Sequence, residues 1–146
     1  MQTFLPYPDF VKTVAILDMR RLGKQRLEAR DIYRLITGKT LGASRKQMAY
    51  LKRRYSNHPA VNMWRGYEDA LAQYMNFCIK EWVHRGYVNN IELLPTPDKI
   101  EYPPWLGDDD FHASHRSKLL FKKPEHYGRL GWNEPDDLDY VWPGRE

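Results

Sequence analysis

A single carboxylate, Glu28, lies within a strongly basic stretch of the chain. The stretch from Arg20 to Gly38 is RRLGKQRLEARDIYRLITG, and its basic side chains are Arg20, Arg21, Lys24, Arg26, Arg30 and Arg34. Placed against a polyanion, Glu28 would repel phosphate and weaken binding. A carboxylate here is better suited to a site where positive charge develops during a reaction, as on a sugar that loses its substituent, and where protons move.

Glu28 also has a simpler interpretation as an ion-pair partner on a helix. Lys24 precedes it by four residues, and exposed pairs at this spacing contribute only about 0.2–0.5 kcal/mol. On either interpretation we expect Glu28 to stay ionised, because nearby positive charge favours the charged form of a carboxyl group. The helical pattern alone leaves both interpretations open.

The sequence HASH contains a second group of titratable side chains. His112 and His115 lie three residues apart on one predicted helix face, downstream of Asp108–Asp110. This spacing is compatible with a metal site, but no further ligand is apparent, so we expect no metal. Contact with phosphate or with a base, and simple packing, explain the two histidines about equally well.

Charge is distributed unevenly along the chain. Residues 1–86 carry 16 Lys or Arg and 7 Asp or Glu, a net charge of +9, whereas residues 87–146 carry 7 and 12, a net charge of −5. This asymmetry predicts a face that binds a polyanion, for which nucleic acid is the commonest partner. A solvated basic surface without a ligand is the simpler alternative.

Composition favours one domain over residues 1–146. The chain is 42% hydrophobic and 14% aromatic, which suffices for a core and argues against disorder. No apolar run is long enough to span a membrane, and the first ten residues do not resemble a signal peptide. The single cysteine, Cys78, excludes an internal disulfide framework, and we expect it to be a buried, inert thiol.

Capping residues define the first of three predicted principal helices. Asp9 is a suitable cap for a first helical stretch, Asp18 for its continuation, and Gly38 ends it. Gly23 inside this helix costs about 1 kcal/mol relative to Ala, which indicates the close approach of another backbone. Arg26 falls within the apolar arc of the helix, an unusual place for a solvated charge.

The second principal helix is predicted from Pro59 to Gly86, with apolar side chains at helical spacing. The third covers residues 108–123, with Asp110 as its cap and an acidic start that suits the helix dipole.

The connections between these helices are long and irregular. Residues 39–57 form a basic connector with a short helix around residues 46–55, and the four prolines of residues 87–107 predict an ordered strap. No alternating strand pattern of convincing length is present. The predicted class is therefore mainly α, a single compact domain of three principal helices with no substantial sheet.

Three stretches of the chain, taken in order, resemble a known family. RLGKQRLE places a Leu six positions before Glu28 on a basic helix. NHPAVNMWRGYEDAL, followed by CIKEWVHRGY, begins with His58 and ends in Arg-Gly-aromatic, and FHASHRSKLL precedes an aromatic tail. Their order and spacing resemble the pyrimidine-dimer DNA glycosylases, a family of ultraviolet-damage repair enzymes, and look closest to its bacterial and phage branch.

This resemblance implies a glycosylase with AP-lyase activity that excises a pyrimidine photodimer. Family members attack C1′ of the damaged nucleotide with their N-terminal α-amine, form a Schiff base and cut the strand by β-elimination. The resemblance assigns the amine to Met1 and the carboxyl group that stabilises the cationic intermediate to Glu28. An α-amine suits the role because its ordinary pKa is about 7.7–8.0, against about 10.4 for lysine.

The resemblance also implies double-stranded DNA with a lesion as the partner. The residues expected to contact DNA are Gln2, Arg20, Arg21, Lys24, Arg26, Arg30, His58, Arg65, His112, His115, Arg116 and Lys118. We expect a monomer that requires no cofactor, metal or membrane and acts in the cytoplasm, near the nucleoid.

Two positions depart from the family's pattern. Gln2 is too large for ordinary removal of the initiator methionine, so the expected nucleophile is the amine of Met1 rather than that of a small second residue. Leu27 stands where the best-known family member has an arginine next to its glutamate, and we expect Arg26 or Arg30 to supply that guanidinium.

Three other interpretations stay open. Lys24 is an alternative nucleophile beside Glu28 if its pKa is depressed by the neighbouring arginines and by burial. A second alternative is a non-catalytic module of the same fold that binds DNA or recognises a modified base, with the Lys52–Arg54 run adding to its affinity. The third is a structural or protein-interaction role for the acidic C-terminal part.

Overall fold

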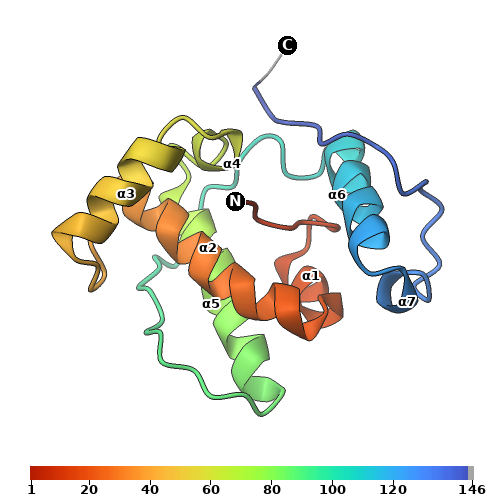
Figure 1. Ribbon diagram of the computed structural model, residues 1–146, viewed down its shortest axis with the longest axis horizontal. Coiled ribbons are helices and arrows are strands. Elements are labelled where there is room, and N and C mark those ends of the chain that lie inside the picture. The colour runs from red at the N-terminus through yellow and green to blue at the C-terminus, as the bar shows by residue number, and fades with distance from the viewer. Residues whose placement is uncertain (145–146) are drawn as a thin grey trace.

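The computed structural model describes residues 1–144 and consists of helices joined by irregular segments. The helices are α1 (Phe10–Ile16), α2 (Met19–Thr37), α3 (Arg45–Tyr55), α4 (Pro59–Asn62), α5 (Glu68–His84), α6 (Asp109–Lys122) and α7 (Pro124–Tyr127). Within residues 1–144 there is no strand, which confirms the mainly-α class. In Figure 1, α2 crosses α5 at the centre, α3 lies on one side, and α6 and α7 lie on the other. Over the same residues, no helix has the length and apolar character needed to cross a membrane.

The predicted ends of the first helical region are present. The Asp9 carboxylate caps α1 by accepting the N–H of Lys12 at 3.1 Å, and Asp18 caps α2. Gly38 ends α2 in the left-handed conformation, with φ of 76°, which glycine adopts at low cost. The short helix predicted in the basic connector corresponds to α3.

The second and third principal helices differ from the prediction in detail. The region from Pro59 to Gly86 is not one helix, because α4 ends at Asn62 and α5 begins at Glu68, with Gly66 between them at φ of 86°. A residue in that conformation cannot continue a right-handed helix. The cap of α6 is Asp108 rather than Asp110, since the Asp108 carboxylate accepts the N–H of Asp110 at 3.2 Å.

Contact between α2 and α5 explains two unusual residues of α2. A Cβ atom at Gly23 would lie 3.0 Å from two ring carbons of Trp82, so the close approach comes from a side chain of α5 and not from a backbone as expected. The Arg26 guanidinium stacks on the same indole, 4.4 Å from its centroid, which accounts for a charge on the apolar arc. Cys78 is buried in this interface, and burial raises the pKa of its thiol to about 12, as befits an inert thiol.

The segment after α5 is irregular but held in place. Residues 87–107 contain no helix or strand and run back past the α2–α5 pair (Figure 1). The Asn76 amide exchanges two hydrogen bonds of 2.8 Å with the backbone of Leu94. This bidentate contact fixes the strap to α5, as the sequence predicted for an ordered connection.

Candidate active site

The side chain of Gln25 in α2 binds the N-terminal segment from one side. Its Oε1 accepts the N–H of Phe4 at 2.8 Å, and its Nε2 donates to the carbonyl of Gln2 at 3.0 Å and to the carboxylate of Glu28 at 2.9 Å. The two backbone partners fix which end of the amide is oxygen. One buried amide therefore sets the position of Glu28 relative to the start of the chain.

Three residues of α6 bind the same segment from the other side. The N–H of Leu5 donates to Nδ1 of His115 at 2.9 Å, and Nδ1 of His112 donates to the carbonyl of Leu5 at 2.7 Å. Arg116 donates to the carbonyl of Pro6 at 2.8 Å. Because residues 2–6 are buried and bonded to both α2 and α6, the terminal amine that precedes them is held at a defined place.

A cavity of about 400 Å³ opens beside this segment. Seven predicted site residues line it: Met1, Gln2, Arg20, Arg21, Lys24, Glu28 and His58. Five further residues, which the sequence did not assign to a site, complete the lining: Phe4, Gln25, Lys122, Tyr140 and Trp142. Its volume is in the range of ligand-binding pockets, about 300–1,000 Å³.

Glu28 and Met1 line the same cavity, and the Glu28 carboxylate accepts a hydrogen bond from the amide of Gln25 at 2.9 Å. Burial raises the pKa of Glu28 above its ordinary value, while the charge of the terminal amine, the backbone N–H of Gln2, the charge of Lys24 and the Gln25 amide act in the opposite direction. The sequence predicted that neighbouring cations favour the ionised form of Glu28; the cations do act in that direction, but the loss of solvation is the larger effect on the pKa.

The simpler interpretation of Glu28 is not favoured by this geometry. Lys24 is exposed, and the ion pairs found among residues 1–144 do not include one between Lys24 and Glu28. The carboxylate accepts a hydrogen bond from Gln25 instead, and the same Gln25 amide binds the backbone of Gln2 in the N-terminal segment.

The C-terminal tail supplies one wall of the cavity. The N–H of Val141 donates to Oγ of Ser114 at 3.2 Å, which holds the tail along α6. Tyr140 and Trp142 on either side of this contact line the cavity, and the Trp142 indole meets the His58 ring edge-on, with centroids 5.9 Å apart. The tail thus joins α4 and α6 around the N-terminus.

Neither Arg26 nor Arg30 supplies a guanidinium to this cavity. Arg26 stacks on Trp82 and donates to Asn89 at 2.7 Å, whereas Arg30 lines other cavities. A residue two positions before or after Glu28 lies on nearly the opposite side of α2, so the side chains of Arg26 and Arg30 point away from Glu28. Arg20 and Arg21 are the arginines that line the cavity.

Several other residues predicted to contact DNA lie elsewhere. His112 and His115 are 1% and 0% exposed, so they have the packing role that the sequence left open and no ring atom available to a phosphate. Burial lowers the pKa of His115 to about 3, which keeps the ring neutral. Arg116 is bonded to the N-terminal segment and Arg65 is exposed outside the cavity, while Lys118 lies over the ring of Tyr140 at 5.1 Å.

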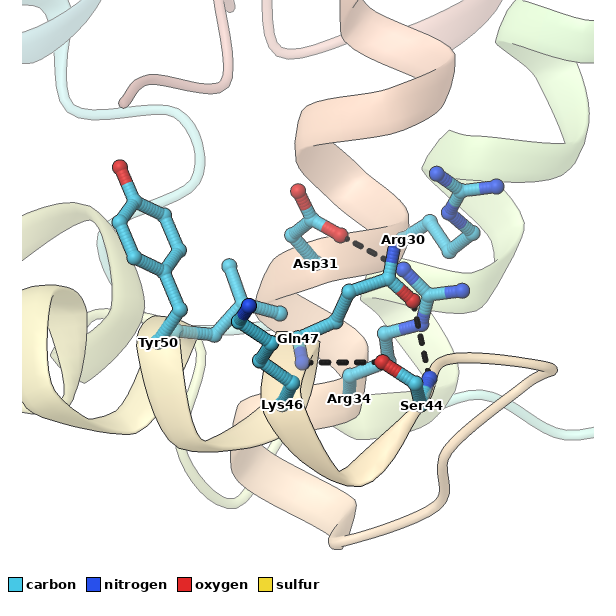
Figure 2. A pocket seen from close by; sticks show the side chains of 8 residues that line it. Arg30, Asp31, Arg34, Ser44, Lys46, Gln47 and Tyr50 are labelled. Atoms are coloured by element: carbon cyan, nitrogen blue, oxygen red, sulfur yellow. Dashed lines mark hydrogen bonds and ion pairs between the residues drawn. The ribbon is translucent and has the colours of Figure 1, made fainter.

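A larger cavity, of about 720 Å³, lies between α2 and α3 (Figure 2). Figure 2 shows that four of its polar side chains are bonded in pairs: Asp31 to Arg34, which are 2.9 Å apart, and Ser44 to Gln47 in a capping box. The Asp31 carboxylate of this cavity is therefore paired with Arg34, whereas Met1 lines the cavity beside Glu28. Size alone does not identify the reactive site here.

The sequence model of one family, described as pyrimidine dimer DNA glycosylase, matches residues 1–94. The chain belongs to this family. The match includes the N-terminal segment and helices α1 to α5, and so contains Met1 and Glu28 of the cavity. No curated protein and no solved structure matched the chain. Membership supports the function of a pyrimidine dimer DNA glycosylase, a DNA repair enzyme whose substrate is DNA that contains a lesion.

The site of this pyrimidine dimer DNA glycosylase extends beyond the matched residues. Lys122, Tyr140 and Trp142 come from α6 and the tail. Nothing in their spacing marks them as site residues, because only the folding of the tail along α6 brings them to the cavity. Gln25 was detectable, since it lies one helical turn before Glu28 and on the same face.

Proposed function

We propose that this glycosylase is also an AP lyase, with the α-amine of Met1 as its nucleophile and Glu28 as the carboxyl group that moves protons. The observation that supports this most directly is the pairing of the two groups in one cavity. Met1 and Glu28 line the same cavity, the charge of the amine acts on the Glu28 carboxylate, and Gln25 connects that carboxylate to the backbone of Gln2.

The proposed reaction begins at C1′ of the damaged nucleotide. The amine nitrogen of Met1 forms a bond to C1′ as the bond from C1′ to the base breaks, and the base keeps the electron pair. The nitrogen then loses a proton, which Glu28 accepts. When the C1′–O4′ bond opens, Glu28 returns that proton to O4′, and a protonated Schiff base joins Met1 to C1′.

Strand cleavage follows from this Schiff base. Glu28, ionised again after it returns its proton to O4′, accepts a proton from C2′; the electron pair enters a new double bond, and the C3′–O3′ bond breaks with the phosphate as leaving group. Hydrolysis of the imine then frees the enzyme. A carboxyl group that accepts and returns a proton works best with a pKa close to the working pH, so the upward shift of the Glu28 pKa suits this role.

Trapping with borohydride tests this proposal. The protein is incubated with ultraviolet-irradiated duplex and with duplex containing one abasic site, because borohydride reduces a Schiff base to a stable adduct. We expect adducts on both substrates and, by peptide mass spectrometry, at the amine of Met1. An adduct at Lys24 would assign the nucleophile to the lysine. DNA binding without adduct or nicking on either substrate would leave the non-catalytic module as the function.

A further inference from the structure

The side chain of Gln2 brings an unused hydrogen-bond donor to the cavity. Gln2 is 6% exposed, its Oε1 accepts the N–H of Thr3 at 2.9 Å, and its Nε2 is buried without a hydrogen-bond partner. Because the N–H of Thr3 requires an oxygen opposite it, the amide orientation is fixed and Nε2 is the free end. A buried donor without a partner costs folding free energy, so stability does not explain this arrangement.

Tyr140 lies close to this amide on the facing wall. Burial raises the pKa of the Tyr140 hydroxyl, and the amide of Gln2 acts on it in the opposite direction, but the pair does not reach hydrogen-bond geometry. The donor is therefore available to a ligand that enters between the N-terminal segment and the tail.

Burial separates this donor from the cationic side chains of the cavity. Arg20, Lys24 and Lys122 are exposed, so they are placed to meet phosphates at the cavity mouth. Nε2 of Gln2 is neutral and buried, and such a donor is best satisfied by a neutral carbonyl, because burying a phosphate costs far more. A pyrimidine has a carbonyl, O2, next to the N1 atom that is bonded to C1′.

We propose that Nε2 of Gln2 donates a hydrogen bond to the O2 carbonyl of the pyrimidine that is excised and stabilises that base as it leaves. The inference rests on the proposed function, which puts C1′ beside the amine of Met1. When the C1′–N1 bond breaks, N1 keeps the electron pair and shares the negative charge with O2, and the detached base, still joined to its neighbour in the dimer, takes a proton at N1 from water. A fixed donor at O2 binds this developing charge more strongly than it binds the neutral ground state.

Two variants of Gln2 separate this role from a purely structural one. Gln2→Glu keeps an oxygen for the N–H of Thr3 but replaces the donor, whereas Gln2→Met keeps the length of the side chain without any polar atom. Both variants keep a large residue at position 2, so the initiator methionine is retained and Met1 still carries the terminal amine. Gln47→Glu is the matched control, because it adds the same charge at an exposed position of α3.

The measurement compares two single-turnover rates for each protein. The first is cleavage of the C1′–N1 bond in irradiated duplex, called base release here although the cut base stays joined to its partner in the dimer, and the second is strand cleavage at a preformed abasic site. Removing one such donor is expected to slow base release by about 100-fold or more. Cleavage at the abasic site, which has no base to stabilise, stays within about threefold of the wild-type rate. Thermal unfolding confirms that the variants fold.

Equal losses of both rates would overturn the inference, since Gln2 would then only position Met1. Unchanged base release in both variants would overturn it as well. If the wild-type protein itself forms no adduct at an abasic site, the proposed function fails and this inference fails with it. If borohydride traps the wild-type protein on an abasic site but the Gln2 variants lose both rates equally, the proposed role of Gln2 is rejected while the proposed function stands.

Discussion

Nε2 of Gln25 lies 2.9 Å from the carboxylate of Glu28, while the oxygen of the same amide accepts the N–H of Phe4. A single side chain thus connects the carboxyl group of the candidate site to the segment that carries the α-amine. The amide also lies 2.7 Å from the hydroxyl of Tyr74 in α5, so this connection is anchored in the core.

Glu28→Gln is expected to abolish most of the activity. The amide cannot accept and return a proton, so base release and cleavage at an abasic site should each fall by about 100-fold or more. The rates are measured under single turnover on irradiated and abasic duplex. Glu101→Gln, at an exposed position of the strap, removes the same charge and should keep wild-type rates. If Glu28→Gln is nearly as active as the wild-type protein, Glu28 does not take part in the reaction and its role is structural.

The same substitution should change how stability depends on pH. Because the pKa of Glu28 is raised in the folded state, the folded protein binds this proton more tightly than the unfolded chain, and ionised Glu28 opposes folding at neutral pH. The stabilising contribution of the protonated form is complete below the ordinary value of 4.5 and is lost as pH rises through the raised pKa. Urea unfolding of both proteins across this range should show Glu28→Gln gaining stability relative to wild type as pH rises. A difference that does not vary with pH would contradict the shift.

Gln25→Leu is expected to lower stability and activity together. The leucine fills a similar volume but leaves the N–H of Phe4, the carbonyl of Gln2 and the carboxylate of Glu28 without this partner. Each buried group left unpaired costs about 1–3 kcal/mol, so a loss of about 3 kcal/mol in the free energy of unfolding is expected. Chemical denaturation measures it, and the control is Gln47→Leu, which removes an exposed amide and loses only its capping-box contact with Ser44. A loss no greater than that of the control would show that water replaces the amide.

Lys122→Gln tests whether α6 contributes to DNA binding. Lys122 is exposed and lines the cavity, although it lies beyond the residues matched by the family. Loss of one phosphate contact should weaken binding to every duplex alike and reduce the slope of log affinity against log salt by about 1. Fluorescence anisotropy at several salt concentrations measures the slope, with Lys99→Gln on the strap as control. Equal slopes for the two variants would exclude Lys122 from the interface.

The helix ends that depend on adjacent residues were predictable from the sequence. Asp9, Asp18 and Gly38 determine helix ends through the adjacent backbone, and the structure has those ends where they were expected. The break between α4 and α5 was missed because Trp64, which is fully buried, continues the apolar spacing through the turn. Only the backbone conformation of Gly66 marks the interruption.

The candidate site was predictable only in part. Arg21, Lys24 and Glu28 share one arc of α2, so helical spacing was enough to group them. The pairing of Glu28 with Met1 came from the family resemblance. Tyr140 was not predicted as a site residue, because its approach to the cavity depends on hydrogen bonds between the tail and α6 that no local pattern encodes.

The anchored N-terminal segment has a consequence for maturation of the protein. Because residues 2–6 are bonded on both sides, the start of the chain is held in one place beside Glu28. A formyl or acetyl group on Met1 would remove the charge and the lone pair that the proposed chemistry uses. Under that chemistry, the enzymes that process the start of a new chain decide whether the folded protein can act on DNA.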